Sequence, residues 1–466
     1  MKKEKQIEIR IADNRFKRGL RSKEKQRAKR RAKYHYYVKA KLFFKTDTIG
    51  NIFEKWLPAN LYYLLFCEES DLHYDKVIIN IPENNGLFKV PDKFSIIDYP
   101  KESYRFIQNV LGALITQKYS RIDIDYSECT RLDLGAQALF DIILKEVFIF
   151  YEKCNMYKKT RPKVKEINAV NVVDKNVQKL LFSVGSPVIH RNKPFKFSDI
   201  IPYPLCIHDR EKNGDPVKIR EQKDIDTTKL IDYVIDCLKT LNRKLTPEKL
   251  DDLSTVIGEI LINAEEHSTT KHRFSIGYFQ EINEVGKHYG VFRLAILNFG
   301  KTIYEKFKDP NCPNKSVVEK MKSLSEQYTK KKYFVLKGFE EETLWTLYAL
   351  QDGVTSVPPE RYRKRGNGSI QFIESFFNIK GKMKENDDCS KMVILSGNTN
   401  ITFDGYYNIT TGIVNGEEYK FMTFNNSGKI DDKPDSKFVK FVDNYFPGTI
   451  ISAQILFNED DLTIEI

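Results

Sequence analysis

The spacing of the apolar residues changes repeatedly along this chain, from a period of two to a helical period and back. Between residues 46 and 205, the strand-like runs are KVIINIP, RIDIDYSEC and INAVNVV. The runs with helical spacing are NIFEKWLPANLYYLLFCEES, SYRFIQNVLGALITQKY, the stretch from Leu134 to about Tyr151, and KNVQKLLFSVG. Strands that alternate with helices predict an α/β (α+β) architecture, in which helices pack on the faces of a sheet.

The second half of the chain carries its own helix and strand signals. The Pro-containing stretch 201–219 predicts a linker, and 227–244 predicts an amphipathic helix. Thr246 can cap a second helix that starts at Pro247 and runs to about His267. The other expected elements are strands at 273–282 and 289–300, a long charged irregular region to about 365, a helix at 366–379, and strands in MVILSGN and FPGTIISAQILFNED.

Positive charge is concentrated at the start of the chain. Residues 1–33 hold 15 Lys and Arg against 4 Asp and Glu, a balance of +11 out of +12 for all 466 residues. The remainder is therefore close to neutral. A chain of this length favours two or three domains. We expect a basic arm over 1–45, an α/β domain over 46–205 and a second domain over 206–466.

The basic arm has two interpretations. Its cations could neutralise nucleic-acid phosphates, and Tyr34, Tyr36 and Tyr37 could stack on bases. Alternatively, the arm is solvated or docks on a protein partner, as charge runs commonly do.

Cysteine usage and hydropathy bear on the compartment. The seven cysteines are odd in number and never spaced as CxxC, so neither a disulfide framework nor a zinc site is expected. The charged N-terminus has no apolar run typical of a signal peptide. The most apolar helical stretch is interrupted by Asp141, Lys145 and Glu146, which argues against a membrane span. We expect a cytoplasmic protein with no membrane partner.

The densest chemistry lies in GEILINAEEHS, residues 258–268. Glu259, Asn263 and His267 are spaced i, i+4, i+8 and therefore share one helical stripe. This stripe offers a carboxylate able to act as a general base, an amide oxygen able to join a Mg²⁺ shell, and an imidazole. A solvated acidic helix face is the alternative for the stripe, and Glu265 and Glu266 are expected on the solvent side.

The pattern E-x-x-x-N-A-x-x-H resembles the N-box of the GHKL superfamily, which includes gyrase, heat-shock chaperones, histidine kinases, mismatch-repair ATPases and anti-sigma-factor serine kinases. Three further motifs follow in the family order. Asn298–Ile303 stands in the place of D-x-G-x-G, Arg365–Ser369 in that of a glycine pair at a helix start, and Pro447–Thr449 in that of a Gly-Thr opening a terminal strand. The resemblance covers about 200 residues. It implies a GHKL-type α/β sandwich with a mixed sheet and a flexible ATP lid over about 301–365. Within the lid, residues 340–357 are expected to form a helix that ends at Gly353.

The same resemblance implies the cofactors ATP and Mg²⁺, with Glu259 as general base and Asn263 as the Mg²⁺ ligand. The residues that it places at the nucleotide are Asn263, His267, Asn298, Gly300, Lys301, Thr302, Arg365, Gly366, Gly368, Ser369 and Thr449. Two of these positions depart from the family pattern. Asn298 replaces the Asp that accepts the adenine amino hydrogen, and Thr302 replaces the second glycine of the loop.

The segment IDIDYSECTRLDLGAQALFDIIL resembles the STAS fold of anti-sigma-factor antagonists over some 25 residues. Asp125 and Asp133 hold the acidic places, whereas Leu134 stands where the phosphorylatable Ser or Thr would be. The resemblance implies a STAS-like scaffold for 46–205, and Leu134 argues against a phospho-switch at that position. Another α/β interaction domain is an equal alternative.

A rival pattern overlaps the first of the loop motifs. Ala295–Thr302 satisfies the relaxed P-loop pattern A/G-x₄-G-K-T, but its bulky Leu-Asn-Phe interior fits poorly around phosphate. It would also leave the N-box and both glycine motifs unexplained, so we favour the GHKL interpretation.

Three functions remain open at this stage. The first is an ATPase whose turnover drives lid closure and rearrangement of a homodimer that signals to a protein partner, for example in a bacterial stress or antiviral defence system. The second is a serine/threonine protein kinase like the anti-sigma factors. The third is a nucleotide-sensing scaffold with little turnover that binds nucleic acid through residues 1–33. A phospho-accepting His box does not precede the domain, which argues against a histidine autokinase.

Overall fold

The computed structural model describes most of the chain beyond the basic arm. The described residues are 57–79, 81–158, 164, 166–188, 197–209, 216–266, 268–284, 287–329, 339–356, 368–380, 390–414, 416–457 and 462–464. The basic arm, 1–45, lies outside them.

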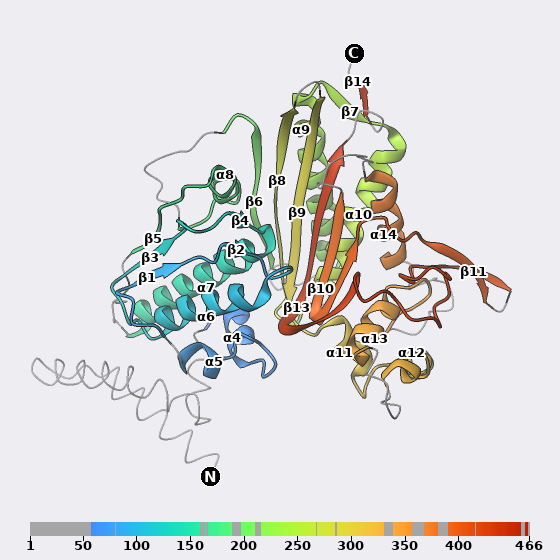
Figure 1. Ribbon diagram of the computed structural model, residues 1–466, viewed down its shortest axis with the longest axis horizontal. Helices are drawn as coiled ribbons and strands as arrows, with labels where there is room; N and C mark the ends of the chain where they lie inside the picture. The colour runs from blue at the N-terminus through green and yellow to red at the C-terminus, as the bar shows by residue number, and fades with distance from the viewer. Residues whose placement is uncertain are drawn as a thin grey trace, which may run out of the picture.

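The N-terminal part is built on parallel strands (Figure 1). A three-stranded sheet has the order β1-β3-β5, from Leu87–Lys89, Arg121–Asp125 and Glu166–Val170. A second parallel pair joins β2, Lys93–Phe94, to β4, Arg131–Leu132. The helices of this part are α4 (Ala59–Phe66), α5 (Tyr74–Ile79), α6 (Pro100–Ile115), α7 (Leu134–Lys158) and α8 (Lys175–Ser183). The predicted α/β alternation is therefore confirmed.

Two details of this part bear on the predictions. The strand expected from KVIINIP is wrong, because Tyr74–Ile79 form the helix α5, in which Tyr74 and Val77 are buried at helical spacing. Leu134 begins α7 and is buried in the core. Asp133 just before it accepts hydrogen bonds from Ser95 Oγ and from the Gly135 amide.

The C-terminal part is built on a five-stranded sheet of order β10-β13-β9-β8-β6. The strands are Lys391–Phe403, Val439–Phe457, Lys287–Phe299, His272–Glu284 and Ile200–Asp209, in that order. Every pairing between them is antiparallel. The prediction of a mixed sheet is therefore wrong for the described strands. The predicted linker is also wrong as far as Asp209, because β6 pairs with β8 as an edge strand.

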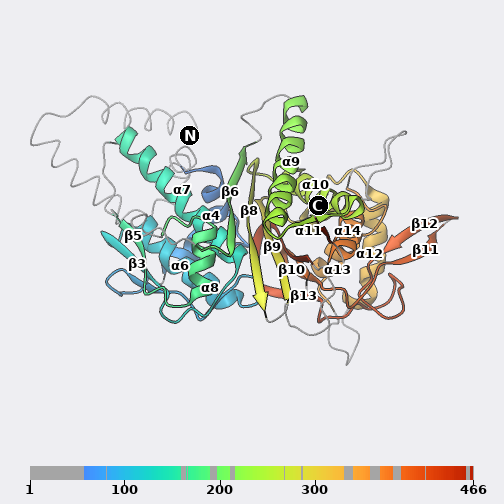
Figure 2. The ribbon, with the colours of Figure 1, turned by 90° about the horizontal axis from the view of Figure 1, so that it is seen from above.

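Helices cover both faces of this sheet (Figures 1 and 2). One face packs on the N-terminal part and carries Phe274, Leu297, Phe299, Phe446 and Ile450. The opposite face packs on α9 (Pro216–Thr240), α10 (Pro247–Glu266) and α14 (Gly368–Ile379). The Thr246 hydroxyl accepts a hydrogen bond from the Lys249 amide at 3.3 Å, as expected of the residue that caps α10.

The lid region is largely helical, which confirms the helix predicted within 340–357 and contradicts the irregular structure expected before it. It contains α11 (Ile303–Lys308), α12 (Lys315–Thr329) and α13 (Glu341–Ala349), with Gly353 in the turn that follows α13. Both α11 and α13 pack against β10. The remaining strands are β7 (Arg243–Leu245), β11 (Thr410–Val414), β12 (Glu417–Phe421) and β14 (Leu462–Ile464). No helix in the described part of the chain is long and apolar enough to cross a membrane.

Candidate functional site

A row of polar side chains crosses the helix-covered face of the five-stranded sheet. Asn298 on β9 lies opposite Thr449 on β13, and Thr449 lies opposite Ser396 on β10. The Ser396 and Thr449 hydroxyls are 2.9 Å apart and hydrogen-bonded. Because side chains alternate between faces along a strand, these three point away from the face that carries Leu297 and Ile450. Sequence motifs 150 residues apart are thus neighbours on one surface of the sheet.

Asn298 is the least satisfied residue of this row. Its side chain is fully buried, and neither its amide oxygen nor its amide nitrogen has a hydrogen-bond partner. A buried polar group without a partner costs about 1–3 kcal/mol, so this position favours a bound polar group. An Asn amide presents an acceptor beside a donor, which matches the amino group of adenine and its neighbouring ring nitrogen.

The residue before Thr449 must be glycine, because the backbone of β9 lies very close to it. A Cβ built on Gly448 would lie 2.1 Å from the backbone oxygen of Asn298, and the φ angle of Gly448 is +150°. Only glycine fits there without moving the backbone. The Pro447–Thr449 motif nevertheless lies inside β13 and does not open it, so that detail of the prediction is wrong.

The N-box helix and the glycine-motif helix meet at Glu259. Helices α10 and α14 pack side by side, and a Cβ built on Gly368 would lie 2.2 Å from Glu259 Oε2. The carboxylate thus lies against the first residue of α14, where the helix dipole favours negative charge. Ser369 is in the same first turn, and Asn263 is half-buried one turn after Glu259 on α10.

The loop after β9 has local structural roles. Gly300 has a φ angle of +155°, and its amide donates to the Pro447 oxygen at 3.2 Å. Lys301 pairs with Asp309. Thr302 is fully buried and caps α11, where its hydroxyl accepts from the Glu305 amide and the Glu305 carboxylate accepts from the Thr302 amide. The capping box accounts for Thr302 without a ligand.

The structure also bears on the rival loop pattern. Ala295–Phe299 are paired residues of β9, and α11 begins three residues after Gly300. A P-loop needs those residues in a loop that wraps phosphate, so the P-loop interpretation of Ala295–Thr302 is wrong.

Some of the expected nucleotide contacts cannot be located. His267, Arg365 and Gly366 lie outside the described residues. Within the described ranges, no group of three or more His, Cys, Asp or Glu side chains could hold a metal ion. Asn263 therefore stays the predicted Mg²⁺ ligand, and the other ligands would have to come from phosphate and water.

One expectation about α10 is wrong. Glu265 is only 8% exposed and does not face solvent. Its Oε2 lies 4.0 Å from Nε2 of His208 on β6. The side chain of Glu266 is not among those described.

Sequence reasoning missed the continuation of the polar row. Ser396, Arg273 and His208 lie in apolar strands, and only the two-residue alternation along β8 and β6 could have placed Arg273 and His208 on the helix-covered face. His208 pairs with Arg273 across these strands. Burial and the nearby Arg273 guanidinium lower the pKa of His208 below its usual value of 6.5.

The GHKL resemblance rests on the four sequence motifs and their order alone. A scan against models of protein families, a search of curated proteins and a search of solved structures gave no match to this chain.

Proposed function

We propose that this chain binds Mg-ATP between α10, α14, the end of β9 and the Pro447–Thr449 stretch inside β13, and acts as a nucleotide-dependent switch of the GHKL type. The observation that carries the proposal is Asn298, a fully buried amide without partners beside Thr449. An adenine base would satisfy its donor and its acceptor together.

The residues of α10 would act on the phosphate side of the nucleotide. Glu259 is the candidate general base, because a carboxylate at that position can hold the proton of an attacking water. Asn263, one turn on, would hold Mg²⁺, which when bound would neutralise phosphate charge. The start of α14 carries no Cβ at Gly368, so its backbone amides can approach an anion closely.

The negatively charged Glu259 carboxylate and a phosphate would compete for the same place, the N-terminal end of α14. In this structure the carboxylate lies against Gly368, at the helix start that also attracts phosphate. We infer that nucleotide binding moves the Glu259 side chain outward, from the helix start toward the water that it would activate.

Helices α11 and α13 would change position when the nucleotide site is occupied. Both pack against β10, and α13 also packs against β13, the strands that carry Ser396 and Thr449. Because Asn298 is fully buried, a base can reach it only if the covering side chains move. Nucleotide entry would therefore shift the lid helices, which is the property that a switch requires.

Calorimetric titration with ATP, with and without Mg²⁺, tests this proposal. We expect Asn298→Ala to weaken ATP binding about 10- to 100-fold, because it removes two hydrogen bonds to the base. Asn263→Ala should lose only the Mg²⁺-dependent part of the affinity. Glu259→Gln should bind ATP and lose turnover by about 100-fold or more. Gln371→Ala, on the exposed side of α14, is the matched control.

The outcomes separate the candidate functions. Absence of ATP binding to the wild-type chain at millimolar concentration would sink the proposal. Phosphate transferred to a Ser or Thr of a partner protein, without free phosphate release, would favour the kinase. Nucleic-acid binding that weakens steeply with salt and is lost on deletion of residues 1–33 would favour the scaffold.

A further inference from the structure

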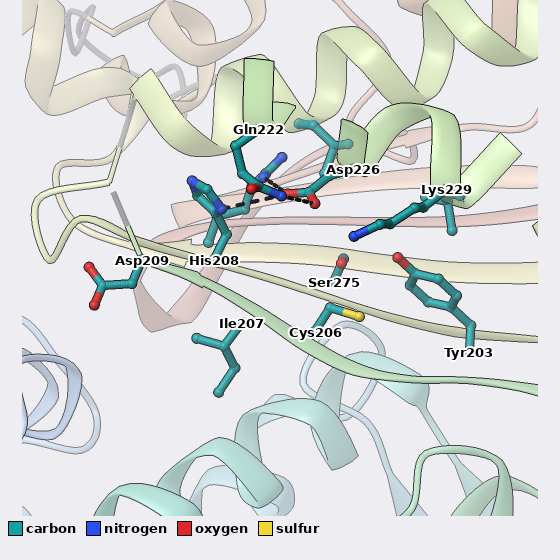
Figure 3. Close-up of a pocket in the computed structure, with 12 residues that line it drawn as sticks. Tyr203, Cys206, Ile207, His208, Asp209, Gln222, Asp226, Lys229 and Ser275 are labelled. Atoms are coloured by element: carbon teal, nitrogen blue, oxygen red, sulfur yellow. Dashed lines mark hydrogen bonds and ion pairs between the residues drawn. The ribbon is translucent and has the colours of Figure 1, made fainter. Parts of the chain in front are cut away.

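A pocket lies beside α10, between α9 and the strands β6 and β8 (Figure 3). Its volume is about 370 Å³, within the usual range for small-molecule sites. Its polar walls include Tyr203, His208, Gln222, Lys229, Arg273 and Ser275. Leu261 of α10 closes the pocket on one side, whereas Glu259 of the same helix faces α14.

Arg273 is the central cation of this pocket. It is 2% exposed, and its Nη2 donates to Asp226 Oδ2 at 2.6 Å. Its Nε and Nη1 have no hydrogen-bond partner. Buried donors are almost always paired in folded proteins, so these N–H groups indicate a missing acceptor.

The neighbouring acid cannot supply that acceptor. The Asp226 Oδ1 already accepts from Gln222 Nε2 at 2.8 Å, and its Oδ2 accepts from Arg273. Asp209 lies at 3.9 Å from the His272 Nε2, at the end of β6. Glu265 does not line the pocket, but its charge acts on Arg273 from the α10 side, and its Oε2, 4.0 Å from His208 Nε2, has no hydrogen-bond partner.

The pocket wall holds two carboxylates, Asp209 beside His272 and Asp226 beside Arg273, and its further donors include Lys229, Tyr203 and Ser275. Lys229 reaches from α9 toward Tyr203 and Ser275, whose hydroxyls face the same space (Figure 3). Together with Arg273 they form a set of two cations and two hydroxyls around one volume. Cations and hydroxyls arranged in this way bind carboxylates and phosphates.

We propose that this pocket binds the anionic group, carboxylate or phosphate, of a small molecule through Arg273 and Lys229, with Ser275 and Tyr203 donating from their hydroxyls. Asp226 holds the Arg273 guanidinium in place from behind. Arg273 lies on the strand next to Asn298, on the same face of the sheet, but the proposal rests on the pocket residues alone and does not depend on the nucleotide function.

Titration calorimetry in chloride buffer at constant ionic strength tests the proposal. The probes are inorganic phosphate, acetate and succinate. We expect one of them to bind the wild-type chain at a single site at low millimolar concentration or below. Lys229→Ala should weaken this binding about 10-fold, and Ser275→Ala about 3- to 10-fold, because each removes a donor to a charged group. Lys239→Ala, on the same helix outside the pocket, should leave it unchanged.

The relative affinities of the probes distinguish the possible ligands. Tighter binding of phosphate than of the carboxylates identifies a phosphorylated ligand, and the reverse order identifies a carboxylic acid. Saturable binding of none of the probes to the wild-type chain at about 20 mM would overturn the proposal. Equal losses in Lys229→Ala and Lys239→Ala would also overturn it, because they would show non-specific attraction. ATP binding that persists in Lys229→Ala shows that the two sites are independent.

Discussion

Gly368 and Glu259 make contact across two helices, and this contact can be changed without altering the fold. An alanine Cβ at Gly368 would displace Glu259 Oε2, which is the end of a flexible side chain. We therefore expect Gly368→Ala to fold normally but to bind ATP more weakly, because the added Cβ also hinders the approach of phosphate to the start of α14. The displaced carboxylate should lower the rate of ATP hydrolysis by about 10- to 100-fold, if Glu259 is the general base. Hydrolysis assays beside Gln371→Ala measure this effect, and equal rates in the two variants would remove Glu259 from that role.

Asp141 gives a prediction that does not depend on any ligand. It is buried in α7, accepts from Gln137 Nε2 and Ser186 Oγ, and has no partner for its Oδ2. Burial raises the pKa of Asp141 to about 7. The folded state therefore binds a proton that the unfolded state, with its ordinary Asp pKa, has already released at pH 5. Stability is consequently lost as the pH rises from 5 through 7.

The Asp141→Asn variant removes that titration. We expect its free energy of unfolding, relative to wild type, to rise by about 2–3 kcal/mol between pH 5 and pH 8. Urea denaturation at both values measures the difference. A constant difference between the two proteins would show that Asp141 has no raised pKa.

Single residues also show how far the sequence could predict the site. Glu259 and Asn298 could be identified because each stands in a motif of fixed spacing. Glu265 could not, because periodicity along α10 does not reveal how many neighbours surround a helix. Because β6 lies on one side of α10 and α14 on another, more of the helix surface is buried than in a helix with a single apolar face. The partnerless atoms of Asn298 and Arg273 depend on tertiary packing and have no signature in sequence.

At the level of secondary-structure elements, the capping box of α11 predicts a stability effect. Thr302→Ala removes the hydroxyl that accepts from the Glu305 amide. We expect a loss of about 1–2 kcal/mol in the free energy of unfolding, with ATP affinity within about twofold of wild type. Denaturation and ATP titration of the same variant separate the two effects. A large loss of affinity without a loss of stability would give Thr302 a direct role at the nucleotide.

Each of the mispredicted elements has its own physical reason. The run KVIINIP is too short for its period to distinguish a strand from a helix, and its first residues complete the helix α5. Prolines 202 and 204 favoured a linker, yet proline is tolerated on an edge strand such as β6. The charged residues of α12 suggested a loop, but they lie on the exposed side of a helix whose Met321 is buried.

For the whole molecule, the coverage of both sheet faces is the main constraint. Phe274, Phe299 and Phe446 pack against the N-terminal part and belong to one continuous core with it. We expect a fragment of residues 197–466 to expose this face and therefore to aggregate or to bind the dye ANS strongly. Co-expression with residues 57–188 should suppress both effects. Light scattering and ANS fluorescence measure them, and a monodisperse fragment that does not bind the dye would show that the C-terminal part folds alone.

Helix α10 forms a wall of both proposed sites, with Glu259 and Asn263 toward one and Leu261 toward the other. A packed helix cannot shift on one flank and stay fixed on the other. If an anion beside Arg273 changes the affinity for ATP by some factor, thermodynamics requires ATP to change the affinity for that anion by the same factor. The occupancy of each site would then depend on the concentrations of both small molecules.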